Sequence, residues 1–269
     1  MSNIVPFPLA EDNQHVKNLA ELLTKNGKGK DAQDVAEVFN CICGMENDLK
    51  KAMKEISALR SELSVMRDEQ NHPIKTMLHK AADSLMSQLR AAYKQIVALK
   101  DKFIGGCKQA VEDIKDKGIV AANDIVGALD IKGDIESSRA RACKIVAFNE
   151  KKVANIEAAA TQFHSAGRAV KNIGLALIGK EPVPDIKPNG KLAKLLQSPF
   201  RLEIRCAKHS IANSDKALAH LDKLEKAAEL RIARDKPSVL DEMKQHKEAV
   251  VQIPSAPKPI RAKVAGQEI

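Results

Sequence analysis

One stretch of the sequence has the residue types and spacing of a phosphate-binding loop. Residues 174–181 read GLALIGKE, and a P-loop reads Gly, four residues, Gly, Lys, then Ser or Thr. Gly174, Gly179 and Lys180 fit, but Glu181 puts a carboxylate where Mg²⁺ and phosphate need a hydroxyl. A P-loop also follows a strand, whereas a helical pattern precedes these glycines and PVPDIKPNG follows them. We interpret the stretch as a helix end and keep an NTPase as the minor alternative.

The other residues that could carry chemistry do not form a catalytic or metal-binding pattern. The seven histidines are scattered, and neither H-E-x-x-H nor G-x-S-x-G occurs. The odd number of cysteines argues against a disulfide framework, and on a helix Cys41 and Cys43 would point about 200° apart. We expect buried thiols at Cys41, Cys43, Cys107, Cys143 and Cys206. The sequence predicts a protein that is not an enzyme and has no catalytic residues, cofactor or metal.

Long helices are the elements that the periodicity predicts most clearly. Apolar residues step by four and three from Met45 to Met66, and again from Leu78 to Phe103, which is a heptad pattern. A third run extends from Ala142 to Leu177, and a fourth from about Leu192 to Arg234, with Pro199 either starting or kinking its main part. Residues 15–42 predict a helix, a glycine loop and a second helix.

The third run has small residues at every second position of its apolar face. Ala160, Gly167 and Gly174 are seven residues apart, which predicts close packing against another helix. Each glycine costs about 1 kcal/mol of helix propensity relative to alanine, so close packing is a plausible compensation. Long apolar faces also favour a partner, and we expect a homodimer.

These patterns predict an all-α fold, an elongated helical bundle or coiled coil of about four long helices. We predict five segments: an N-terminal helical unit at 1–43, a long-helix region at 44–180, a linker at 181–190, a basic helix at 191–234 and a mostly disordered tail at 235–269. No apolar run reaches the roughly eighteen residues of a membrane span, and the N-terminus does not read as a signal peptide. We expect a cytoplasmic protein with no membrane partner.

Basic residues concentrate near the fourth run. The chain has a net charge of +9, and residues 161–234 contribute fourteen basic and seven acidic residues. The candidate binding residues are Lys187, Lys191, Lys194, Arg201, Arg205 and Lys208. The last three lie at i, i+4 and i+7, on one face of a helix. Such a face suits an acidic protein or the phosphates of DNA or RNA, or it is simply solvated.

Three stretches together resemble an uncharacterised family of helical proteins encoded on integrative conjugative elements and related mobile DNA of Firmicutes. They are residues 16–63 (VKNLAELL to LRSEL), FHSAGRAVKNIGLALIGKE and KPSVLDEMKQHKE. The resemblance implies a bacterial cytoplasmic protein with an accessory role in a mobile element, and it transfers no functional residues. Our leading prediction is a non-enzymatic scaffold or inhibitor that binds another protein. The alternative is a nucleic-acid-binding accessory that uses residues 187–208.

Overall fold

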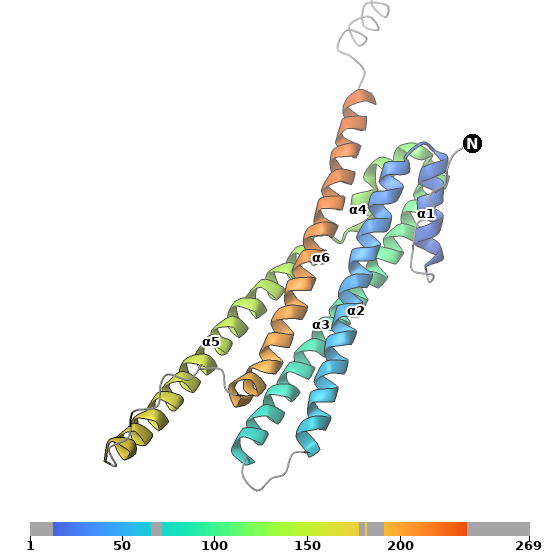
Figure 1. The fold of residues 1–269 in the computed structure, drawn as a ribbon. Helices are drawn as coiled ribbons and strands as arrows, with labels where there is room; N and C mark the ends of the chain where they lie inside the picture. The colour runs from blue at the N-terminus through green and yellow to red at the C-terminus, as the bar shows by residue number, and fades with distance from the viewer. Residues whose placement is uncertain (1–12, 66–71, 178–180, 182–190, 236–269) are drawn as a thin grey trace, which may run out of the picture. The chain divides into compact units, whose positions relative to one another are not determined.

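The computed structural model is an all-α helical bundle and describes residues 13–65, 72–177, 181 and 191–235 (Figure 1). In chain order the elements are α1 (Gln14–Lys25), α2 (Gly29–Val65), α3 (His72–Lys117), the 3₁₀ helix η1 (Ile119–Asp124), α4 (Ile125–Leu129), α5 (Lys132–Leu177) and α6 (Lys191–Asp235). No strand occurs within these ranges. The chain divides into two compact units, Met1–Ala228 and Glu229–Ile269. The site described below lies in the first unit, and the tail predicted for residues 236–269 lies outside the described residues.

The helix, glycine loop and helix predicted at the front of the chain are confirmed. The side chains of Val16, Leu19 and Leu23 are fully buried along one face of α1. The helix ends where Gly27 adopts φ +76°, which lets the amide of Lys28 donate to the Leu23 carbonyl at 2.8 Å. α2 then runs without interruption through residues 43 and 44, where the predicted N-terminal unit and long-helix region meet.

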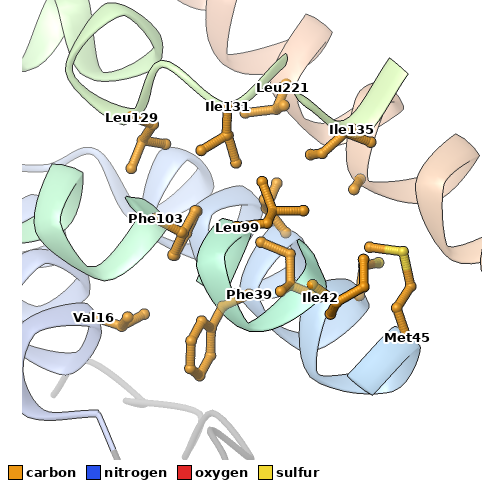
Figure 2. Close-up of a cluster of buried hydrophobic side chains, with 14 of the residues drawn as sticks. Val16, Phe39, Ile42, Met45, Leu99, Phe103, Leu129, Ile131, Ile135 and Leu221 are labelled. Carbon is orange, nitrogen blue, oxygen red and sulfur yellow. The ribbon is translucent and has the colours of Figure 1, made fainter. Parts of the chain in front are cut away.

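The predicted heptad positions of α2 and α3 are mostly buried, and the structure shows that these two helices pack on each other. Of the predicted α2 positions, Met45, Leu49, Ala52, Ile56 and Leu63 are buried. On α3 the buried positions are Leu78, Ala82, Leu85, Leu89, Ile96, Leu99 and Phe103. The rings of Phe39 and Phe103 stack with their centroids 5.7 Å apart. Figure 2 shows that this core also receives Val16 from α1, Leu129 from α4, Ile135 from α5 and Leu221 from α6.

The segment after α3 contains two short helices that close the end of the core. Gly118 stops α3 with φ +78°, and η1 and α4 follow. Ile125 and Leu129 of α4 are buried. α4 lies so close to α3 that a Cβ at Gly106 would be 2.7 Å from the carbonyl oxygen of Ala128. Gly106 therefore makes the close approach of α3 and α4 possible.

The four long helices alternate in direction, as the cross-helix contacts show. Glu46 of α2 contacts Lys100 of α3, whereas Arg60, further along α2, pairs with Asp83, earlier in α3. The same reversed order relates α3 to α5, α5 to α6, and α6 to α2. At the start of α5, the ammonium group of Lys132 lies 2.9 Å from Asp222 and 2.6 Å from Glu225 of α6. These ion pairs raise the pKa of Lys132, so it stays protonated.

α6 begins at Lys191, and Pro199 lies inside it. Pro199 therefore does not start the main part of the helix, which was one of the two roles predicted for it. A proline has no N–H, so the carbonyl of Leu195 lacks its usual helical donor. Pro199 is buried, next to a buried Gln197. This first quarter of α6 forms part of the candidate site.

Candidate interaction face on α6

The three basic residues predicted to share one face of α6 each pair with a carboxylate of a neighbouring helix. We call Arg201, Arg205 and Lys208 the α6 basic face. Arg201 Nη2 lies 2.9 Å from Glu157 Oε1, and Lys208 Nζ lies 2.8 Å from Glu150 Oε1. Both glutamates belong to α5, whereas Arg205 pairs with Glu55 of α2. The side chains in these pairs are 44–60% exposed.

The two pairs with α5 follow a simple spacing rule. Glu150 and Glu157 are seven residues apart, as are Arg201 and Lys208. Because α5 and α6 run in opposite directions, the later glutamate meets the earlier cation. Two turns of helix return a residue to nearly the same face, so both glutamates lie on one face of α5. The α6 basic face is therefore complementary to a helix with carboxylates at heptad spacing.

Two grooves flank α6 at this face. The α5–α6 groove, of about 500 Å³, is lined by Glu150, Val153, Ala154, Glu157, Arg201, Ile204, Arg205, Lys208 and His209. The α2–α6 groove, of about 600 Å³, is lined by Glu55, Ile56, Leu59, Lys194, Gln197, Ser198, Pro199, Arg201, Leu202 and Arg205. Arg201 and Arg205 border both grooves. Each groove combines charged side chains with apolar ones, Val153 and Ile204 in the first and Ile56 and Leu202 in the second.

An aromatic pair holds a further cation between α5 and α6. The ammonium group of Lys152 lies 4.3 Å from the ring centroid of Phe148 and 4.8 Å from that of Phe200. Both distances are within the range of cation–π attraction. Phe148 is nevertheless 59% exposed, which leaves apolar surface beside the basic face.

A separate apolar cavity of about 240 Å³ lies where α2, α3, α5 and α6 meet. Glu203 of α6 lies at its wall, is only 7% exposed, and accepts a hydrogen bond from Asn149 Nδ2 at 2.7 Å. Burial raises the pKa of the Glu203 carboxyl, because one amide partner does not compensate for lost hydration. Cys206 lines the same cavity, and burial raises its pKa to about 11. The Cys206 thiol is therefore protonated at neutral pH and unsuited to act as a nucleophile.

The structure describes only some of the other predicted site residues. Lys194 is exposed and lines the α2–α6 groove. Lys187 lies outside the described residues, as does the side chain of Lys191. On α5, Ala160 is half-buried, whereas the surroundings of Gly167 and Gly174 are not among the described features. Their predicted close packing stays a prediction, as does any partner role of the basic residues.

The structure agrees with the helical context that the GLALIGKE stretch was predicted to have. α5 continues through Gly174 to Leu177, so the first glycine lies in the last turn of a long helix and not after a strand. Residues 178–180, which include Gly179 and Lys180, lie outside the described residues.

The cations of this face could be predicted from the sequence, but their carboxylate partners were not predicted. Glu55 lies on α2 and Glu150 and Glu157 lie on α5, and none of them is among the predicted site residues. A signal was present, because the heptad spacing of Glu150 and Glu157 mirrors that of Arg201 and Lys208. The buried residues Gln197 and Glu203 had no such signal, because a single polar residue beside Leu196 or Leu202 does not show whether its side chain is buried.

The helices define the class of protein, an all-α bundle, and α6 carries a basic face that is paired with carboxylates of α2 and α5. The chain belongs to a family of unknown function, DUF6674, whose model matches residues 12–265. No curated protein and no solved structure matches it. Among the helices that the structure describes, none has the length and apolarity to cross a membrane.

Proposed function

We propose that this protein is a non-enzymatic interaction protein that binds an acidic helical segment of another protein through the α6 basic face. The observation that carries the proposal is the set of carboxylates that this face already holds. Arg201 and Lys208 receive two glutamates spaced seven apart on one helix. A partner helix with the same spacing would present the same groups.

Exchange of these carboxylates for those of a partner would cost the fold little. Ion pairs between half-exposed side chains contribute roughly 0–1 kcal/mol each. The main core lies elsewhere, among buried side chains such as Phe39, Ile42 and Phe103. A partner could therefore displace Glu150 and Glu157 from the basic face without unfolding the α2–α3 core.

The same arrangement weighs against the nucleic-acid alternative. A phosphate backbone that reached Arg201, Arg205 or Lys208 would also approach the carboxylate paired with each of them. Nucleic-acid affinity grows with the number of phosphates neutralised, and adjacent carboxylates reduce that number. Nucleic-acid binding therefore stays the alternative prediction, and sensitivity to nuclease separates the two.

The proposed setting is the bacterial cytoplasm, as an accessory protein of a mobile element that binds a host-defence or conjugation component. This part rests on the sequence resemblance alone. We also propose a homodimer. The exposed side chains of Phe148 and Ile173 on α5, 59% and 63% exposed, support it by offering apolar surface.

Affinity capture from a bacterial host with mass spectrometry tests the proposal. We expect one protein to be captured with or without nuclease, and to be lost when Arg201, Arg205 and Lys208 are replaced together by Glu. The matched control replaces Lys80, Arg90 and Lys94, three exposed residues of α3, and makes the same change in net charge. Equal loss in the control, or capture that disappears with nuclease, would overturn the proposal.

A further inference from the structure

The α2–α6 groove contains an unsatisfied buried donor. Gln197 is 1% exposed, and its Oε1 accepts a hydrogen bond from Arg201 Nε at 3.0 Å. This bond fixes the orientation of the amide, because a flipped amide would set two donors against each other. Gln197 Nε2 then has no acceptor in the described part of the chain. Buried donors without partners are rare and destabilising, so this one calls for an acceptor.

The charges that line the groove favour an anionic acceptor. Lys194, Arg201 and Arg205 are its three cations, and Glu55 is its single carboxylate. Arg205 is paired with Glu55. Arg201 is paired with Glu157 of α5, which does not line this groove. Lys194 has no ion pair within the described residues. The groove therefore keeps one uncompensated positive charge, that of Lys194, in the same lining as the unsatisfied amide.

The groove also has an apolar part to its lining. Ile56 and Leu59 of α2 and Pro199 and Leu202 of α6 contribute to it, and Ile56 and Pro199 are buried. A ligand for this groove thus needs an anionic head and an apolar body. The groove volume of about 600 Å³ is within the roughly 300–1,000 Å³ range of small-molecule sites.

We propose that the α2–α6 groove binds a small amphiphilic carboxylate, with its head group at Gln197 Nε2 and Lys194 and its hydrocarbon chain along Ile56, Leu59 and Leu202. A carboxylate fits better than a phosphate, because a dianion would be repelled more strongly by Glu55. A free small molecule also fits better than a side chain of a partner helix, because Gln197 lies below the surface. The groove shares Arg201 and Arg205 with the α6 basic face, but the two head-group residues, Gln197 and Lys194, are not part of that face.

Titration with octanoate, octanol and octylamine tests the site, with binding followed by two-dimensional NMR of the full chain. The three probes share a hydrocarbon chain and differ in head group. We expect octanoate to bind, with chemical-shift changes on both sides of the groove, and octanol and octylamine to bind at least about tenfold more weakly. Equal affinity for octanoate and octanol would overturn the proposal, as would no octanoate binding at millimolar concentration.

Two variants locate the head group. Gln197→Leu and Lys194→Ala should each weaken octanoate binding about tenfold, the loss expected for one hydrogen bond to a charged group. Lys194 is exposed, so its variant tests the site even if Gln197→Leu fails to fold. Lys216→Ala changes an exposed lysine of α6 outside the groove and should leave the affinity unchanged. A loss of the same size in Lys216→Ala would show nonspecific charge attraction and contradict the site.

Discussion

Two adjacent glycines of α3 should respond to the same substitution with opposite signs. Helix propensity alone favours alanine over glycine by about 1 kcal/mol at either position. Gly105 is exposed, and a Cβ built on it meets no atom within 4 Å. Gly105→Ala should therefore raise the free energy of unfolding by about 1 kcal/mol.

Gly106→Ala receives the same propensity gain but meets the backbone of α4. Its Cβ would lie 2.7 Å from the Ala128 carbonyl oxygen and 2.8 Å from Leu129 Cα, whereas ordinary contact begins at 3.4 Å. α3 and α4 must separate by several tenths of an ångström, and Leu129, which is 1% exposed, must move with the backbone. Overpacking of this kind costs about 1–3 kcal/mol, and rigid backbone places it at the upper end. We expect a net destabilisation of about 1–2 kcal/mol.

Urea unfolding followed by circular dichroism at 222 nm measures both variants against the wild-type chain. The two variants should differ by about 2–3 kcal/mol, with Gly105→Ala more stable than the wild type and Gly106→Ala less stable. Equal stabilisation in both would refute the close α3–α4 approach, because only that approach distinguishes the neighbouring positions.

Three further predictions concern the core and the ion pairs. Phe103→Ala should lower the free energy of unfolding by about 3–5 kcal/mol in denaturant titrations, because it removes a fully buried ring. Burial raises the pKa of Glu203, so the folded state holds its proton more tightly than the unfolded state, and stability should fall as pH rises from about 4.5 through the raised pKa. Glu203→Gln should remove that fall in unfolding curves measured across pH, and an unchanged pH profile would contradict it. A double-mutant cycle on Arg201 and Glu157 should give a coupling of roughly 0–1 kcal/mol that shrinks with salt, and a larger coupling would mean that exchange with a partner is costly.

The helices could be predicted from the sequence because apolar periodicity and helix-ending glycines are local features of the chain. The heptad steps through Leu49 and Leu85 identify the buried faces of α2 and α3. The glycine at position 27 marks the end of α1. The close approach at Gly106 was not predictable, because its partner atoms come from a helix about twenty residues later. A glycine within a helical pattern by itself indicates only a weaker helix.

The candidate site was predictable in part for the same reason. The spacing of Arg201, Arg205 and Lys208 is a property of one helix, so their shared face follows from the sequence. Their carboxylate partners depend on which helices pack beside α6 and in which direction, and periodicity does not determine either. The unsatisfied amide of Gln197 depends on atomic contacts within one groove, which composition does not reveal.

The most direct test of the α6 basic face is titration with a fluorescent helical peptide that carries two glutamates seven residues apart on an alanine and leucine face. We expect anisotropy-detected binding at about 50 mM salt that weakens steeply as salt is raised. We expect no binding for the matched peptide with glutamines, and none when Arg201, Arg205 and Lys208 are replaced together by Glu. A duplex DNA should bind more weakly than the peptide at the same salt. Equal binding of the glutamate and glutamine peptides, or tighter binding of the DNA, would contradict the central claim.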